Sequence, residues 1–218
     1  MSVLPAPTLD MVHTALQLPL PGRAAQQTMA PRPRPGDLVG LPDYCPHEGA
    51  VMLLVYERCG NLIMPFTRRT DKVQVHRGQI SFPGGSREPH DIDLAHTALR
   101  ETGEELGVTE EVVEVLGALT PLYIASTQFC VHPYVGHAAQ LGPFQSDPRE
   151  VAEVIEVSLE QLLDPLTRQE EDQIRDGQPF RIPSYRVAEH RIWGATAMML
   201  AEFLALLQSA RAGTLSGL

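Results

Sequence analysis

The most informative part of this sequence is HRGQISFPGGSREPHDIDLAHTALRETGEELGV, residues 76–108. Its second half has the periodicity of an amphipathic helix, with Asp93 suited to cap the start and Gly107 to end it. Six residues fall within one arc of a helical wheel and form an apolar side: Leu94, Ala95, Ala98, Leu99, Thr102 and Leu106. We therefore predict a helix that buries this side against a core.

Three glutamates lie along one rim of the predicted helix, directly beside its apolar side. At about 100° per residue, Glu101 and Glu105 lie within roughly 40° of each other, and Glu104 lies about 60° from Glu101. Like charges four residues apart destabilise a helix, and although Arg100 can pair with Glu104, the other two have no obvious partner on the helix. A divalent cation would relieve the repulsion, because Mg²⁺ prefers hard oxygen ligands. A bare E-x-x-E-E pattern alone would favour a solvated acidic surface instead.

Residues 82–85, FPGG, form a tight glycine loop just before the helix, and such a backbone can approach a ligand closely. Gly84 and Gly85 are therefore candidate substrate-binding residues. Together with RETGEELGV, the loop resembles the Nudix box, G-x5-E-x7-R-E-U-x-E-E-x-G-U with U aliphatic. The matching positions are Arg100, Glu101, Glu104, Glu105, Gly107 and Val108. Six fixed residue types at fixed spacing make the resemblance specific.

The sequence departs from the Nudix box in two places. One residue is inserted between the glycine loop and Arg100. The upstream glutamate of the box therefore falls on Ile92, and Asp91 or Asp93 stands in for it. Thr102 replaces an aliphatic residue. These departures concern the upstream carboxylate and leave the main glutamates in register.

The resemblance implies an α/β protein with the Nudix fold, an α/β/α sandwich around a mixed β-sheet. It also implies hydrolysis of a nucleoside diphosphate linked to another group, with Mg²⁺ or Mn²⁺ bound by Glu101, Glu104 and Glu105. The metal would withdraw charge from the diphosphate and lower the pKa of the attacking water. Arg100 would orient the carboxylates, and Glu104 and Glu150 are both candidates for the general base.

The residues before the box are similar to the signature of coenzyme A pyrophosphatases, L-L-T-x-R-[SA]-x3-R-x3-G-x3-F-P-G-G. Thr67, Arg69, Gly78 and residues 82–85 match it, whereas Thr70 and Gln74 depart from it. This narrower resemblance implies that coenzyme A or a derivative is cleaved to 3′,5′-ADP and (acyl-)phosphopantetheine.

Cationic residues gather just before the glycine loop, at Arg68, Arg69, Lys72 and Arg77. Coenzyme A carries a 3′-phosphate besides its diphosphate. We therefore expect Arg68, Arg69 and Arg77 to bind substrate through charge-assisted hydrogen bonds. A charged hairpin surface is the alternative for these residues.

Two other functions remain open at this point. One is a Nudix hydrolase acting on ADP-ribose, a dinucleotide or another nucleoside diphosphate derivative, which would use the same metal site. The other is a non-catalytic Nudix-fold binding module, against which the intact E-x-x-E-E stands.

The bulk composition limits the partners and the location of the protein. A formal net charge of −10 without a basic stripe argues against nucleic acid or a membrane as partner and leaves a small-molecule diphosphate. The cysteines Cys45, Cys59 and Cys130 are odd in number and far apart, so we expect free thiols in a reducing cytoplasm. The start of the chain does not resemble a signal peptide, which also favours a cytoplasmic protein. The oligomeric state stays open, with a homodimer as one outcome.

Proline content divides the chain in two. Residues 1–47 hold nine of the 19 prolines, and we expect a loosely held N-terminal arm that contributes little to the core, although residues 11–18 fit a short helix. Residues 48–218 form the expected Nudix hydrolase domain. Apolar patterns in it predict strands at 50–56, 61–67, 112–124, 129–138, 151–157 and 180–187, with further helices at 159–163 and 196–208.

Overall fold

A computed structural model describes residues 6–33, 42, 44–70, 78–175 and 177–216. The centre of these described residues is a mixed sheet of eight strands with the order β3-β2-β1-β7-β5, in which β4 also pairs with β1, β6 with β7 and β8 with β2. The strands are β1 (His47–Arg58), β2 (Asn61–Arg69), β3 (Ile80–Ser81), β4 (Gly84–Ser86), β5 (Glu114–Ala118), β6 (Leu122–Ile124), β7 (Phe129–Ala138) and β8 (Val151–Ser158).

The central strand β1 makes the sheet mixed, because it runs parallel to β7 and antiparallel to β2 and β4. Alternate residues of β1 enter two different clusters of buried side chains. Leu53 and Val55 lie on one face of the sheet, and Met52 and Leu54 lie on the other. Because both faces are covered, the strand predicted at 50–56 is apolar throughout.

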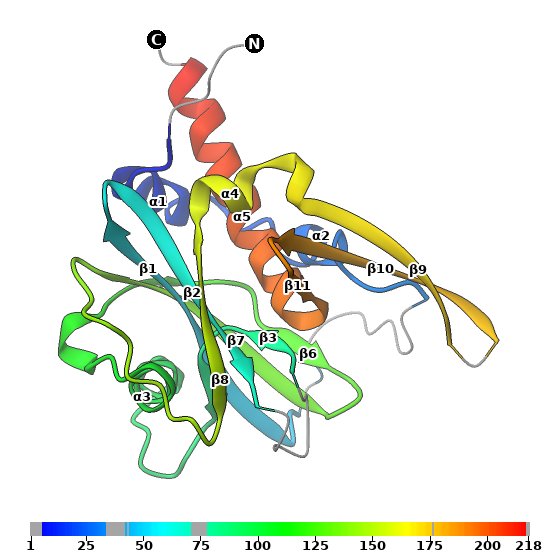
Figure 1. The fold of residues 1–218 in the computed structure, drawn as a ribbon, viewed down its shortest axis with the longest axis horizontal. Helices are drawn as coiled ribbons and strands as arrows, with labels where there is room; N and C mark the ends of the chain where they lie inside the picture. Colours follow the sequence, from blue (N-terminus) through cyan, green and yellow to red (C-terminus); the bar gives the residue numbers. More distant parts are fainter. Residues whose placement is uncertain (1–5, 34–41, 43, 71–77, 176, 217–218) are drawn as a thin grey trace.

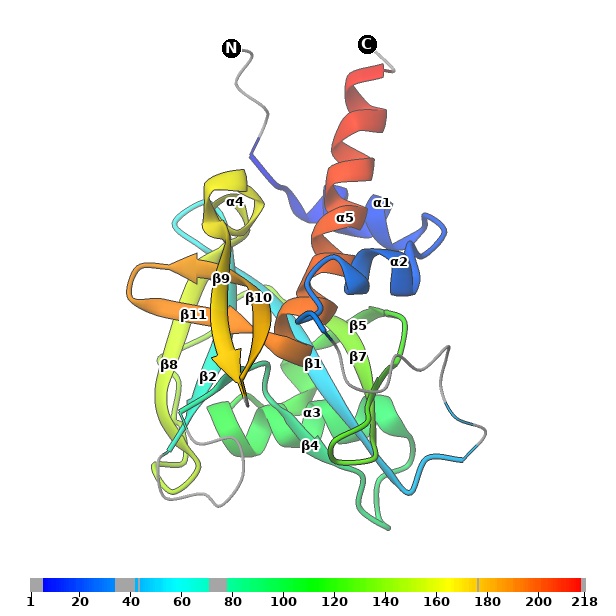
Figure 2. The ribbon, with the colours of Figure 1, turned by 90° about the vertical axis from the view of Figure 1, so that its right-hand side faces the viewer.

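Helices cover both faces of this sheet, as Figures 1 and 2 show. α3 (Leu94–Leu106) packs on the face that carries Met52, and α5 (Gly194–Ser216) lies on the opposite face with α1 (Leu9–Leu16) and α2 (Gly22–Gln27) against it. The predicted α/β/α sandwich around a mixed sheet is therefore confirmed. No helix in the described ranges is both long and apolar enough to span a membrane. The shorter helical elements are α4 (Leu159–Leu163) and two 3₁₀ turns (Glu110–Val112 and Pro165–Thr167).

α3 begins and ends where the sequence predicts. A carboxylate oxygen of Asp93 accepts a hydrogen bond of 2.8 Å from the backbone N–H of His96, and Gly107 ends the helix with a φ of 70°, in the left-handed region that favours glycine. Ala98 and Leu106, on the apolar side, are fully buried. The helix thus holds its acidic rim in a fixed place beside β4.

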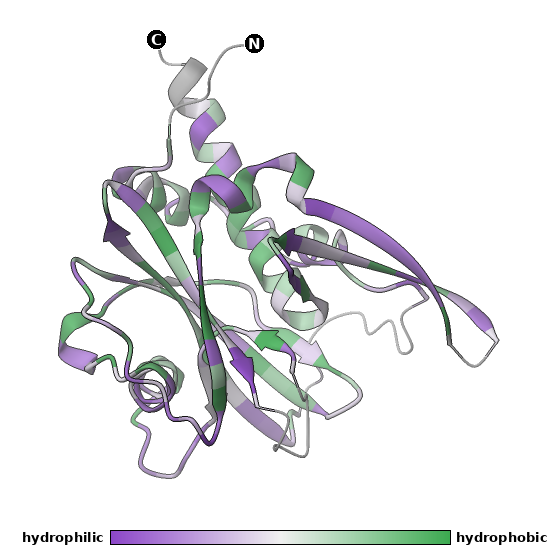
Figure 3. Ribbon diagram, viewed as in Figure 1, coloured by the Kyte–Doolittle hydropathy of each residue, from purple (hydrophilic) through white to green (hydrophobic). Residues whose placement is uncertain are grey.

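A smaller antiparallel sheet has the order β11-β10-β9. Its strands are β9 (Arg168–Arg175), β10 (Gln178–Val187) and β11 (His190–Trp193). The sequence analysis missed β9, because RQEEDQIR is polar and its apolar residue, Ile174, is 81% exposed. Figure 3 shows β9 in hydrophilic colours along most of its length. Pairing with β10 and an ion pair of 2.9 Å between Arg181 and Asp172 stabilise this strand.

The expectation of a loosely held arm is wrong for residues 6–33, here called the N-terminal segment. Its helices α1 and α2 pack on α5. Thr8 caps α1 by accepting a hydrogen bond from the backbone N–H of Met11. The short apolar pieces between the prolines are long enough for one or two helical turns, which is why the proline content was misleading. The apolar side chains of this segment that enter the main core are Met11, Val12, Ala15, Met29 and Ala30.

A buried carboxylate on α5 fixes the N-terminal segment to the rest of the protein. Glu202 is fully buried and accepts hydrogen bonds from the backbone N–H of Gly22 (3.2 Å) and from Nε2 of Gln26 (2.9 Å). It also accepts from the backbone N–H and the hydroxyl of Thr120, in the loop before β6. These donors compensate for the cost of burying the carboxylate. The N-terminal segment is therefore an integral part of the core.

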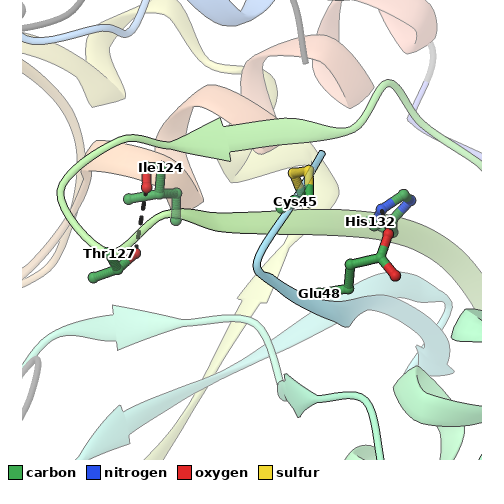
Figure 4. Close-up of a disulfide and its surroundings, with 6 residues drawn as sticks. Cys45, Glu48, Ile124, Thr127 and His132 are labelled. Carbon is green, nitrogen blue, oxygen red and sulfur yellow. Dashed lines mark hydrogen bonds and ion pairs between the residues drawn. A yellow bond between two sulfur atoms is a disulfide. The ribbon is translucent and has the colours of Figure 1, made fainter. Parts of the chain in front are cut away.

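The expectation of free thiols is wrong for two of the three cysteines. A disulfide joins Cys45, just before β1, to Cys130 on β7 (Figure 4). The parallel pairing of β1 with β7 brings these residues together across 85 positions of sequence, with their Cα atoms 6.0 Å apart. Beside the disulfide, Nε2 of His132 lies 3.7 Å from a carboxylate oxygen of Glu48. Cys59 is a free, exposed thiol.

Candidate active site

The carboxylate of Glu101 rests against the backbone of β4. A methyl group added at Gly85 would overlap the carboxyl group of Glu101, so only a glycine leaves room for this side chain. β1 holds β4 in turn, since Gly85 pairs with Ala50. Gly84 is equally restricted, because a side chain there would overlap Val51. Gly85, predicted to bind substrate, thus also sets the position of Glu101, a predicted metal ligand.

Glu105 is almost completely buried between α3 and β2. Its side chain is 4% exposed, accepts a hydrogen bond of 3.1 Å from the hydroxyl of Thr67 and lies 3.9 Å from the guanidinium of Arg69. Burial raises the pKa of Glu105 to about 7, although Arg69 and Thr67 oppose the rise. The nearby charge of Glu101 raises this pKa further, because the two carboxylates repel each other.

Glu101 has the same electrostatic problem. Burial raises the pKa of Glu101, Arg100 opposes the rise, and Glu104 and Glu150 add to it. A divalent cation bound by Glu101 and Glu105 would remove this repulsion, and carboxylate oxygens are ligands that Mg²⁺ prefers. Among the described residues, no group of three acidic, histidine or cysteine side chains is arranged to hold a metal ion together, so the predicted set of Glu101, Glu104 and Glu105 is not assembled. A cation held by Glu101 and Glu105 would take its remaining ligands from water or substrate.

Arg100 is held in place by the buried carboxylate of Asp91. Its Nε donates to Asp91 at 2.9 Å, and its Nη2 donates to the backbone oxygen of Ser86 at 3.0 Å. The hydrogen bonds from Arg100 hold the pKa of Asp91 well below its usual range in spite of burial. Nη1 of Arg100 lies 3.1 Å from Glu101, which is the geometry that an orienting role requires. Of the two aspartates expected near the upstream position, Asp91 contacts the site, whereas Asp93 caps α3.

The two candidates for the general base lie at the outer rim of the site. Glu104 has a side chain that is 61% exposed and pairs with Nη1 of Arg100 at 3.2 Å. Glu150 is exposed in the turn before β8, and its charge raises the pKa of both Glu101 and Glu105. The structure thus brings Glu150 within electrostatic range of the two buried carboxylates, while Glu104 turns towards Arg100.

Comparison with known proteins identifies the family. A model of the NUDIX domain matches residues 46–177. The chain belongs to the Nudix family. The uncharacterized Nudix hydrolase NudL of Photorhabdus laumondii is 35% identical over 160 residues, which cover 73% of this chain and 84% of that protein. NudL of Yersinia pestis is 38% identical over 134 residues, which cover 62% of this chain and 67% of that protein.

Among solved structures, the Nudix hydrolase RenU of M. smegmatis is similar at a TM-score of 0.49, with 19% identity over 78% of this chain and 86% of that chain. The Nudix family predicted from the box is confirmed by the domain match and the NudL relatives, and the chain is by family a Nudix hydrolase. The coenzyme A subgroup stays a prediction, because NudL is itself uncharacterized.

The arginines that precede the Nudix box do not form one cluster. Arg68 and Arg69 point to opposite faces of β2, as successive residues of a strand do. Nε of Arg68 pairs with Glu153 at 2.9 Å, whereas Arg69 lies beside Glu105. The two side chains are therefore not placed to bind one phosphate together. Arg77, the third arginine expected to bind substrate, lies outside the described residues.

The Nudix active site adjoins a cavity of about 700 Å³ that the sequence analysis did not foresee. Arg69, Ser81 and Gly84 line it at the end nearest to Glu105. Trp193 lines it as well. The sequence IWGATA at 192–197 is an apolar run, which by itself gives no indication of a cavity.

Proposed function

We propose that this Nudix hydrolase cleaves the diphosphate bond of coenzyme A or a derivative, giving 3′,5′-ADP and (acyl-)phosphopantetheine. The observation that carries the proposal is a pair of carboxylates beside the FPGG loop, with Glu101 partly buried against Gly85 and Glu105 buried against Thr67. The coenzyme A signature within residues 67–85 supports this substrate among those of the Nudix class. The net charge of −10 agrees with a small-molecule substrate rather than nucleic acid.

Glu101 and Glu105 would hold Mg²⁺ or Mn²⁺, and Glu104 would join them directly or through water. Such a cation, when bound, withdraws charge from diphosphate oxygens and lowers the pKa of water. Arg100 keeps Glu101 oriented, and Glu104 is already engaged in an ion pair with Nη1 of Arg100. Glu150 is therefore the favoured general base, accepting the proton of the attacking water.

Arg69 would bind the diphosphate itself rather than a distant phosphate. Its guanidinium lies 3.9 Å from Glu105, so it reaches the oxygens that would meet the metal. Within the described part of the chain, its Nε is buried without a hydrogen-bond partner, and a substrate oxygen would satisfy it. Recognition of the 3′-phosphate would then fall to Arg68 or Arg77, the other two arginines expected to bind substrate.

A substrate panel tests the proposed function. Coenzyme A, dephospho-coenzyme A and ADP-ribose are incubated with the enzyme and Mg²⁺, and the products are identified by mass spectrometry. We expect kcat/KM for coenzyme A to exceed that for its dephospho form by about tenfold, the effect of one charge-assisted contact. Arg69→Ala should lower kcat/KM for all three substrates. Arg77→Ala should instead reduce the ratio of kcat/KM for coenzyme A to kcat/KM for dephospho-coenzyme A. A higher kcat/KM for ADP-ribose than for coenzyme A would reassign the substrate. If none of the three compounds were cleaved in the presence of Mg²⁺, the proposed function would be rejected.

Removing the metal should make stability depend on pH through Glu105. Its pKa is about 7 in the folded protein against an ordinary value of 4.5, so between these values the folded state keeps a proton that the unfolded state has released. The free energy of unfolding of the metal-free protein should therefore fall as the pH rises from about 4.5 to about 7. Because a cation relieves this penalty, we expect Mg²⁺ to raise the melting temperature more at about pH 8 than at about pH 5. Scanning fluorimetry with MgCl₂ or EDTA measures the difference, and Glu105→Gln should abolish it.

A further inference from the structure

Residues that flank the matched Nudix domain build one wall of the cavity beside the active site. Its wall on the domain side comes from residues 79–82, Gly84 and the turn after β6. The opposite wall lies outside residues 46–177 and includes Pro31, Phe180, Trp193, Ala195, Met198 and Met199. The N-terminal segment and the C-terminal part of the chain thus add a compartment to the family core.

The lining of this cavity is mostly apolar, with the uncharged polar residues Gln79, Ser126 and Thr196 among the other side chains. Among the described residues that line it, the charged side chain is Arg69, and it lies at the end next to Glu105. The hydroxyl of Thr196 donates to the backbone oxygen of Ile80 at 3.0 Å, so it is already satisfied within the protein. A second phosphate would find no cation in the described interior, whereas an uncharged chain would be well accommodated. Methionines such as Met198 and Met199 adapt readily to flexible apolar ligands.

The cavity is continuous with the residues that hold the carboxylates. Arg69 belongs to both, and the hydroxyl of Ser81 in the cavity wall lies 3.3 Å from that of Thr67, which donates to Glu105. A diphosphate at Glu101 and Glu105 could therefore extend its non-nucleoside substituent directly into the cavity. A volume of about 700 Å³ falls within the range of cavities that enclose small-molecule ligands.

We propose that this cavity binds an uncharged, flexible chain carried by the phosphate that does not bear the nucleoside. The enzyme then selects among nucleoside diphosphate esters by the length of this chain. The effect of chain length on turnover rests on the proposed diphosphate hydrolysis. The binding of the chain in the cavity does not depend on which nucleotide the substrate carries.

Alkyl esters of ADP test the inference without pantetheine. We expect kcat/KM to rise by at least about thirtyfold from the methyl to the decyl ester, because each buried methylene favours binding. Ala195→Phe, which narrows the cavity, should reduce this ratio to less than about threefold. Gln208→Phe places the same side chain at an exposed position of α5 and should keep the wild-type ratio. The proposal would be overturned if the ratio of kcat/KM for the decyl ester to that for the methyl ester were near one in the wild type. It would also be overturned if Ala195→Phe kept the wild-type ratio.

Trp193 gives a readout that is independent of turnover, because it is the chain's single tryptophan and lines the cavity. In EDTA, the 10-bromodecyl ester of ADP should quench its fluorescence strongly, whereas the unbrominated decyl ester should not. Quenching without hydrolysis of any ester would support the cavity and reject the proposed function. Hydrolysis that ignores chain length, together with no quenching at saturation, would reject the cavity and leave the proposed function standing.

Discussion

Glu101→Gln and Glu105→Gln are each expected to lower kcat by at least about a hundredfold, because each removes a charged metal ligand. The same substitutions should leave the melting temperature of the metal-free protein unchanged or raise it. Burial raises the pKa of both carboxylates, so a neutral amide of the same shape relieves repulsion that the folded protein otherwise bears. Steady-state kinetics at saturating Mg²⁺ and scanning fluorimetry in EDTA provide the two measurements.

Glu111→Gln is the matched control for these substitutions. Glu111 is an exposed acid soon after α3, and its replacement removes the same charge from the surface without touching the site. Its kcat should equal that of the unaltered enzyme. Near-normal turnover in both Glu101→Gln and Glu105→Gln would mean that the metal is bound elsewhere.

Gly85→Ala should reduce kcat by about a hundredfold or more even though it removes no functional group. The added methyl group would overlap the carboxyl group of Glu101, and this carboxylate would have to move away from its place against β4. Displacement of a catalytic group by about 1 Å can lower a rate by about a hundredfold. Because β4 also pairs with β1, circular dichroism and the melting temperature should accompany the kinetics to show that the variant is folded.

Gly117→Ala offers a matched control for the glycine substitution. Gly117 also lies in a strand, but a methyl group there would make ordinary contacts with Leu16 at 3.7 Å. Its activity should remain close to normal. If Gly85→Ala were folded and fully active, the close approach of Glu101 to β4 would have no role in catalysis.

The sequence predicts those parts of the fold that depend on residue types close together in the chain. The caps of α3 at Asp93 and Gly107 follow from residue types within the helix itself, and its acidic rim follows from helical spacing. β1 is recognisable because a strand covered on both faces needs an unbroken apolar run. The Nudix box combines these local signals with a glycine loop, so the chemistry could be predicted along with the helix.

Features that depend on distant contacts could not be predicted in this way. The partner of Cys45 lies 85 positions away, and only the parallel pairing of β1 and β7 reveals it. β9 is a strand because β10 provides its hydrogen bonds, not because its own residues favour one. The cavity joins side chains from separate segments, from Pro31 to Met199, none of which signals it alone. The orientation of Arg69 towards Glu105 likewise needs the register of β2.

The contact between the N-terminal segment and α5 has a consequence for the order in which the protein can fold during synthesis. Gly22 donates to Glu202 across 180 positions, so the partner of α2 leaves the ribosome long after α2 itself. Until then, the apolar side chains that α1 will bury, among them Met11 and Val12, have nothing to cover them. Contacts of such long range form late and slow folding, and surfaces exposed meanwhile are prone to aggregate. The nascent chain is therefore most in need of a chaperone before α5 emerges.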